Sequence, residues 1–269
     1  MARHEITFNR VVYERPGMRN VPVRRDIEYA QSDAGPLTLD LYDPPDAVGG
    51  RPRPAVVIVG GYPDVGVPLT LGCPSKDMEM VISWAQLLAA SGLMAVSYTK
   101  QDPTRDLRRL VEFLHRNAAT LHVDAGRLAV WAASGNVPVA LSALMEDSDL
   151  EIACAVLCYG FTLDSPESTA VAEASATWKF ANPTAGRTVA NLKSTVPLFL
   201  TRAGADGFAG LNEALDRFIC DALARNLPLT IVNARQAAHA FDLFEANDSS
   251  RHIVELIVGF LQHHLTHSG

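Results

Sequence analysis

A serine in a run of small residues is the first candidate for chemistry in this sequence. Residues 132–136 read Ala-Ala-Ser-Gly-Asn; a mostly apolar run at 127–131 precedes them and a helical pattern follows. A hydroxyl at such a strand–turn–helix corner is held away from its own element, and the N-terminus of the next helix favours negative charge nearby. Ser134 is therefore a candidate nucleophile on a nucleophile elbow, whose usual pattern is Gly-x-Ser-x-Gly. The same residues are also compatible with a serine that caps an ordinary helix.

An acid and a base follow later in the chain, each just past another apolar run. Asp206 follows residues 197–202, and His239 follows residues 227–232. A serine hydroxyl is a weak nucleophile at neutral pH, so it needs a histidine to take its proton and a carboxylate to orient that histidine. Taken singly, Asp206 could shape a turn and His239 could be a loop histidine. The order Ser, Asp, His, each past a strand, predicts a catalytic triad.

The oxyanion that forms on an attacked carbonyl needs N–H donors. The amide of Gly135, directly after Ser134, is the first candidate. The second is the amide of Gly61 or Tyr62, in the glycine loop that follows the apolar run 55–59. A plain Gly-Gly turn is the alternative interpretation of that loop.

Other acids and histidines fit the pattern less well. Asp164 is a second candidate acid because it also follows a strand. The remaining ones fall inside predicted helices, next to His239 or in the C-terminal tail: Asp216, Asp221, Asp242, His115, His122, His263, His264 and His267. The sequence contains no HExxH, Walker A or dinucleotide-binding glycine motif, so we expect no metal ion and no organic cofactor.

Strands and helices alternate along most of the chain and must position these residues. Two alternating strands come first, and buried β-branched runs of the kind found in parallel strands follow from residue 55. This pattern predicts a single α/β domain over 1–269, with a mostly parallel, doubly wound sheet and antiparallel N-terminal strands. The expected strands are 26–30, 37–42, 55–59, 93–98, 127–131, 152–159, 197–202 and 227–232, and the expected helices are 78–91, 103–122, 211–225 and 249–264.

At this point the chain resembles the α/β-hydrolase superfamily, in its esterase and dienelactone hydrolase-like group, over roughly residues 26 to 264. The resemblance implies an eight-stranded sheet and hydrolysis through an acyl-enzyme on Ser134. A serine, where dienelactone hydrolase itself has a cysteine, favours an ester hydrolase. The residues that carry the resemblance are Leu-Asp-Leu-Tyr-Asp-Pro at 39–44, the loop at Gly60 and Gly61, the elbow at Ser134, then Asp206, and His-Ala-Phe-Asp at 239–242.

Two departures from the family pattern accompany the resemblance. Asn136 puts a side chain where a glycine usually lets helix and strand pack closely, and Val59 replaces the frequent histidine before the oxyanion glycines. The long segment 160–196 corresponds to an insertion that often forms a small cap in this family. We expect Tyr62, Tyr159, Trp178 and Phe208 to line an apolar pocket, although Trp178 could equally pack the cap onto the sheet.

Composition limits the partners. The formal net charge of -7 argues against nucleic acid, and no apolar run approaches the ~20 residues of a membrane span. The N-terminus lacks the apolar core of a signal peptide, so a cytoplasmic location is expected. The four cysteines, Cys73, Cys154, Cys158 and Cys220, show no zinc-ribbon spacing, and we expect them to be free. A homodimer is left open.

These observations predict a serine hydrolase that acts on small carboxylic esters, a carboxylesterase. Two alternatives remain at this stage. The first is an α/β-hydrolase-fold protein that binds a ligand with weak or no turnover, because fold alone does not establish activity. The second is an acyltransferase, in which an alcohol or amine replaces water. A peptidase is less favoured, since no charged pocket or added domain is evident.

Overall fold

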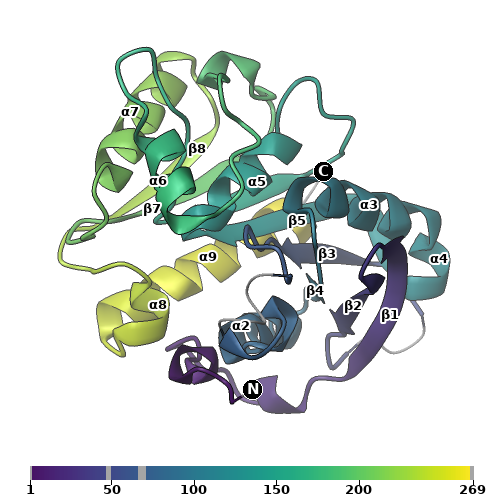
Figure 1. The fold of residues 1–269 in the computed structure, drawn as a ribbon. Helices are drawn as coiled ribbons and strands as arrows, with labels where there is room; N and C mark the ends of the chain where they lie inside the picture. Colours follow the sequence, from purple (N-terminus) through teal and green to yellow (C-terminus); the bar gives the residue numbers. More distant parts are fainter. Residues whose placement is uncertain (1, 47–49, 66–70, 267–269) are drawn as a thin grey trace.

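The computed structural model describes residues 2–46, 50–65 and 71–266 (Figure 1). Parts of the expected connection 43–54 and of the loop 60–76, and His267, lie outside the described residues. Within the described ranges, eight strands form one sheet in the order β1-β2-β4-β3-β5-β6-β7-β8. The strands are β1 (Val23–Ser32), β2 (Gly35–Tyr42), β3 (Arg53–Ile58), β4 (Met94–Tyr98), β5 (Val123–Ala133), β6 (Cys154–Cys158), β7 (Leu198–Ala203) and β8 (Leu229–Ala234).

The pairing of these strands confirms the predicted fold class. β1 pairs with β2 and β2 with β4 in antiparallel orientation, whereas every pairing from β4 through β3 to β8 is parallel. The carboxyl ends of β3, β5, β6, β7 and β8 therefore meet at one edge of the sheet, where ligands bind in folds of this kind.

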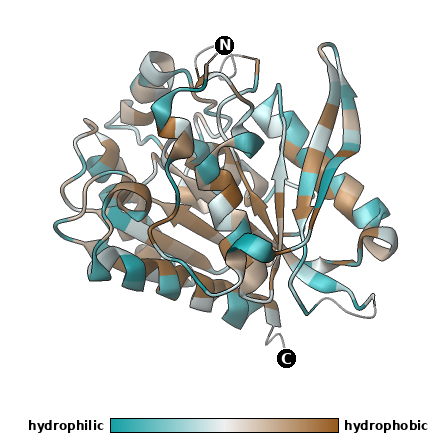
Figure 2. Cartoon of the chain, turned by 90° about the horizontal axis from the view of Figure 1, so that it is seen from below, coloured by the Kyte–Doolittle hydropathy of each residue, from teal (hydrophilic) through white to brown (hydrophobic). Residues whose placement is uncertain are grey.

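Helices cover both faces of the sheet. The helices α2 (Glu79–Ala90) and α9 (Asp248–Thr266) pack on one face. The helices α3 (Pro103–Arg116), α5 (Val137–Ala143) and α7 (Leu211–Ala224) pack on the other, so the parallel strands are buried on both sides (Figure 1). Figure 2 shows brown strands in the interior and helices along which teal and brown residues alternate. No helix of the described residues is long and apolar enough to cross a membrane.

The expected helix 103–122 is divided in two. Pro103 occupies the first turn of α3 and Asp102 caps it, as predicted, by accepting from the Arg105 amide at 3.0 Å. The helix stops at Asn117, which has φ -110° and ψ 14°, and the short helix α4 (Ala118–Leu121) follows. An asparagine side chain competes for local backbone groups, and that of Asn117 binds the carbonyl of Phe113.

The connection from β6 to β7 holds the helix α6 (Ala170–Trp178) and the 3₁₀ helix η5 (Val189–Asn191). Its apolar side chains form a separate small core with the start of α7, in which Phe180 stacks on Phe161 with ring centroids 5.4 Å apart. Whether this segment acts as a cap over a ligand stays a prediction. The remaining short helices are η1 (Glu5–Phe8), η2 (Met18–Asn20), η3 (Ser75–Asp77), η4 (Ser134–Asn136) and α8 (Phe241–Phe244).

Candidate active site

Ser134 stands at a sharp turn between β5 and α5. Its φ of 55° lies in the left-handed region, which is uncommon for a residue with a side chain and marks a constrained position. It is the first residue of η4, and no side-chain hydrogen bond caps η4 or α5. The Ser134 hydroxyl lies instead 2.8 Å from Nε2 of His239. The interpretation as an ordinary helix cap is therefore wrong, and the geometry is that of an elbow that presents a hydroxyl.

The structure brings the three predicted residues into one hydrogen-bonded chain. Nδ1 of His239 donates to Oδ2 of Asp206 at 2.6 Å, which leaves Nε2 to accept the proton of the Ser134 hydroxyl. The second oxygen of Asp206 accepts from the amide of Phe208 at 2.9 Å. The side chain of Asp206 is fully buried, whereas that of His239 is 19% exposed. The acid is thus fixed in place, and the base can still meet a ligand.

The loops that carry the acid and the base lie against each other. The amide of Ala205 donates to the carbonyl of Ala237 at 2.9 Å, one residue before Asp206 and two before His239. Gly204 makes this approach feasible, because a Cβ at that position would overlap the backbone of Arg235. Parallel pairing of β7 with β8 brings these two loops to the same edge.

Asn136 does not block the elbow. Its Oδ1 accepts a hydrogen bond from the amide of Gly61, in the loop after β3. A Cβ on Gly61 would lie 2.6 Å from the carbonyl oxygen of Gly135 and 2.9 Å from Cα of Asn136, so glycine is required on the facing loop. A Cβ on Gly160, after β6, would overlap the side chain of Val137. In the Gly-x-Ser-x-Gly pattern, the second glycine allows the elbow to pack closely. Here Gly61 and Gly160, on the neighbouring loops, allow the same close packing around the elbow.

This contact revises the expected oxyanion donors. Because the amide of Gly61 donates to Asn136, it is already engaged within the protein. The expectation that it points to a substrate oxygen is therefore not met in this structure. The amides of Gly135 and Tyr62 remain the candidate donors.

A buried polar network behind His239 was not predicted from the sequence. The two oxygens of Asp242 accept from the Tyr159 hydroxyl at 2.5 Å and from the Trp84 indole at 2.8 Å. The Tyr159 ring in turn packs edge-on against His239 with centroids 5.0 Å apart. Burial raises the pKa of both the Asp242 carboxyl and the Tyr159 hydroxyl. Asp242, interpreted from the sequence as a cap or turn residue, is instead part of the support of the histidine.

The expected pocket residues separate into two groups. Phe208 lies against His239, with centroids 4.5 Å apart, and Trp178 packs edge-on against Phe208 at 5.3 Å. Trp178 is 52% exposed and Tyr62 is 38% exposed, so both present surface to solvent. Tyr159 is only 2% exposed, and its contacts are those of a support for His239. That these four residues line a substrate pocket stays a prediction.

The other candidate acids, Asp164 and Asp216, have partners outside the triad. Asp164, the second candidate acid, accepts from the amides of Val171 and Ala172 at the start of α6. Asp216 forms an ion pair with Arg202 at 2.7 Å. Among the described residues no group of three or more His, Cys, Asp or Glu side chains could hold a metal ion. All four cysteines are free, as expected.

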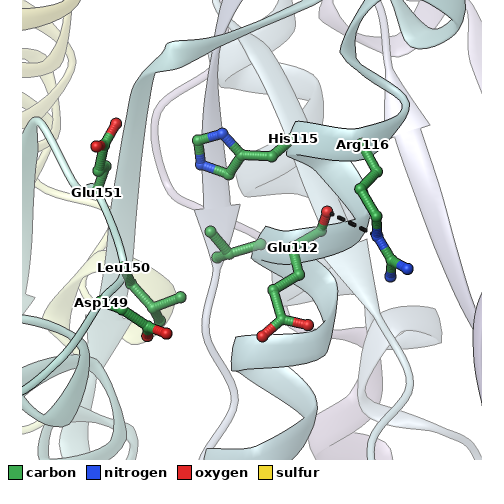
Figure 3. A pocket seen from close by; sticks show the side chains of 7 residues that line it. Glu112, His115, Arg116, Asp149, Leu150 and Glu151 are labelled. Atoms are coloured by element: carbon green, nitrogen blue, oxygen red, sulfur yellow. Dashed lines mark hydrogen bonds between the residues drawn. The ribbon is translucent and has the colours of Figure 1, made fainter.

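A cavity of about 490 Å³ lies at α3, and none of its lining residues belongs to the triad. Figure 3 shows His115 pointing from α3 toward the segment that carries Glu151. Arg116 turns back to the Glu112 carbonyl, at 3.3 Å. The charged side chains that line this cavity, Glu112, His115 and Arg116 among them, are exposed, and we assign it no function.

Comparison with known proteins gives the class of fold. The eight-stranded sheet, its strand order and the elbow are those of the α/β-hydrolase fold, and solved structures with this fold match nearly the whole chain. No model of a known protein family matches the sequence, and no curated protein matches it. The narrower dienelactone hydrolase-like assignment stays a prediction.

Three of the matching structures illustrate the likeness. The propionate-bound esterase Est2 from Thermogutta terrifontis has a TM-score of 0.69 and 18% identity, and the match covers 94% of this chain and 98% of that one. The same esterase phosphorylated by paraoxon has a TM-score of 0.65 and 18% identity, over 93% and 95%. The α/β hydrolase MGS-M1 from a Medee basin deep-sea metagenome has a TM-score of 0.65 and 19% identity, over 91% and 98%.

Proposed function

We propose that this protein is a serine hydrolase of small carboxylic esters. The observation that carries the proposal is the hydrogen-bonded chain from Ser134 through His239 to Asp206, with contacts of 2.8 and 2.6 Å and the serine in a left-handed turn. This arrangement activates a hydroxyl without a metal ion or cofactor.

In the proposed reaction, Oγ of Ser134 attacks the ester carbonyl carbon while its proton passes to Nε2 of His239. The tetrahedral intermediate collapses, the bond to the alcohol oxygen breaks, and the alcohol leaves with the proton from His239. Water then loses a proton to the same nitrogen and attacks the acyl carbon; the bond from that carbon to Oγ of Ser134 breaks, Oγ takes the proton back from Nε2, and the acid leaves. Asp206 keeps the ring in the tautomer that this sequence of transfers requires.

Two observations support small esters as the substrate class. The aromatic side chains of Phe208 and Trp178 stand beside His239 and give an apolar surface to an acyl or aryl group. The matching structures include one esterase both with bound propionate and phosphorylated by paraoxon, which are properties of that protein. The cytoplasmic location and a homodimer stay predictions.

Turnover of p-nitrophenyl acetate and butyrate by the wild type and by Ser134→Ala tests the proposal. We expect the variant to lose the activity down to the background of its preparation, with an unchanged circular dichroism spectrum. Equal rates for the two proteins would contradict the proposal. A folded wild type without turnover would favour the ligand-binding alternative, and a product that carries an added alcohol in place of free acid would favour acyl transfer.

A further inference from the structure

A buried lysine lies directly beneath the glycine loop that follows β3. Lys100, just past the end of β4, is 1% exposed. Its Nζ donates to the hydroxyl of Ser75 at 2.5 Å and stands 5.3 Å from the centre of the Tyr98 ring. A Cβ on Gly60 would overlap Nζ and Cε of the lysine. The end of the Lys100 side chain therefore packs directly against the backbone of this loop. The glycine at position 60 leaves the space that the lysine occupies.

Hydrogen bonds donated by backbone amides connect the segment of Lys100 to the glycine loop. The two oxygens of Asp64 accept from the amides of Ser75 and Lys100, at 2.9 and 2.8 Å. The amide of Asp64 donates to the carbonyl of Lys100 at 2.6 Å. These hydrogen bonds join the segment after β4 to the segment after Gly60, next to the Lys100 amine.

No carboxylate of the described residues comes within 4.0 Å of Nζ of Lys100. The undescribed part of the same loop, residues 66–70, contains no Asp or Glu. Lys76, the other buried lysine of this region, is different, because its Nζ lies 2.8 Å from both Asp26 and Asp40. The Lys100 amine therefore has a hydroxyl and a ring face beside it, and no carboxylate of the described residues in contact with it.

An unpaired buried ammonium is unfavourable for folding, because it loses its hydration without a counter-charge. Burial lowers the pKa of the Lys100 amine, and the more distant carboxylates of Asp64 and Asp106 act against that shift. The groups that face the amine are Ser75 from η3, Tyr98 from β4, Asp64 from the loop and Asp106 from α3. A strongly unfavourable group beside a candidate active site calls for a functional reason.

We propose that Lys100 is a positioning residue of the active site, whose ammonium supports the Gly60 loop and gives it a positive potential that stabilises the oxyanion of the tetrahedral intermediate. Negative charge on the substrate oxygen appears next to this loop only after Ser134 attacks, so the lysine favours the intermediate over the bound ester. This inference rests on the proposed ester hydrolysis. Lys100 would act on the proposed reaction through the loop, without contact to the substrate.

The variant Lys100→Met removes the charge and keeps most of the side-chain volume. We expect kcat for p-nitrophenyl butyrate to fall about tenfold to thirtyfold, less than the 10²–10³ of a lost direct oxyanion donor, while KM changes less than about twofold. The melting temperature should stay the same or rise, because an apolar group replaces a buried charge. The control Lys193→Met removes an ammonium that donates to the carbonyl of Leu150, outside the candidate site, and should retain kcat within about threefold.

A pH profile separates the charge from a packing role. In the wild type, kcat should fall at alkaline pH as Lys100 loses its proton, toward the value of Lys100→Met, and the variant should show no such step. If the variant does not fold, the alkaline fall of kcat at constant KM in the wild type alone tests the charge. A wild-type profile without that fall would overturn the inference.

Binding of phenylboronic acid, measured by titration calorimetry, gives a readout without turnover, because its adduct with a serine is a tetrahedral anion. We expect an affinity at least about tenfold weaker in Lys100→Met. A wild type that hydrolyses esters and binds the boronate, with a variant equal to it in kcat and affinity, would overturn the inference and leave the proposed function standing. A wild type that does neither would overturn both.

Discussion

The two regions that flank Ser134 differ in how their buried ionisable groups are partnered. On the histidine side, both oxygens of Asp206 and both oxygens of Asp242 accept hydrogen bonds. On the side of the glycine loop, the buried ammonium of Lys100 has one hydroxyl as its partner, and no carboxylate of the described residues touches it. Satisfied groups stabilise a fold, whereas an unpaired charge destabilises it. We therefore expect Lys100→Met to keep or raise stability and substitutions in the histidine-side network to lower it, although both lower activity.

The largest effect is expected on the histidine side, at the acid. Asp206→Asn keeps the shape of the side chain but offers an amide to Nδ1 of His239, which favours the wrong tautomer. We expect kcat to fall by about 10³–10⁴ with little change in the circular dichroism spectrum. A rate within about tenfold of the wild type, measured with p-nitrophenyl butyrate, would show that Asp206 is not the orienting acid.

The network behind His239 gives the next test. Tyr159→Phe leaves Oδ1 of the buried Asp242 without a donor, and we expect the free energy of unfolding to drop by about 1–3 kcal/mol in urea denaturation. We also expect kcat to fall, because the ring that packs on His239 loses its anchor. The matched control is Tyr13→Phe, which removes an exposed bond to Glu255 and should change stability by less than about 0.5 kcal/mol. Equal effects of the two substitutions would contradict a role of the Tyr159–Asp242 hydrogen bond in supporting His239.

On the loop side, a glycine at position 136, as in the Gly-x-Ser-x-Gly pattern, should lower the activity. Asn136→Gly produces the second glycine of that pattern, two residues after the serine, but it deletes the acceptor of the hydrogen bond from the amide of Gly61. We expect a fall in kcat of about threefold to tenfold, since a less fixed loop places the oxyanion donors less accurately. Asn136→Asp, which keeps an acceptor oxygen, should retain more activity than the glycine variant. A glycine variant faster than the wild type would mean that Asn136 obstructs the elbow.

The smallest expected effect is a pH dependence of stability that belongs to Lys100. Its pKa is lowered in the folded state from the ordinary 10.5, so the folded protein releases this proton at lower pH than the unfolded chain. The unfolded state then binds more protons in that window, and wild-type stability rises with pH relative to Lys100→Met. The advantage of the variant in melting temperature should shrink between neutral pH and about pH 10. An advantage that grows over this range would contradict a buried charge.

The sequence was sufficient for the sheet and for the meeting of Ser134, His239 and Asp206 at one edge of it. Continuous β-branched runs mark strands buried on both faces, and parallel strands end at one edge, so residues past 127–131, 197–202 and 227–232 had to meet there. Ser134, Asp206 and His239 could be predicted because each follows one of these strands.

What the sequence could not give depends on contacts between distant segments. Asp242 reaches Tyr159 and Trp84 from three separate elements, and no local pattern reveals that meeting. Lys100 was missed because a lysine after a strand is usually solvated. The effect of Asn136 could not be predicted without the facing Gly61, which supplies both the space and the hydrogen bond.

The central claim is that His239 and Asp206 activate the hydroxyl of Ser134. Intact-protein mass spectrometry after treatment with a fluorophosphonate tests it most directly, because this reagent needs an activated serine and no knowledge of the natural substrate. We expect one adduct on the wild type, located at Ser134 by peptide mapping, and none on Ser134→Ala or His239→Ala. A wild type that stays unlabelled, or an adduct at another residue, would contradict the account.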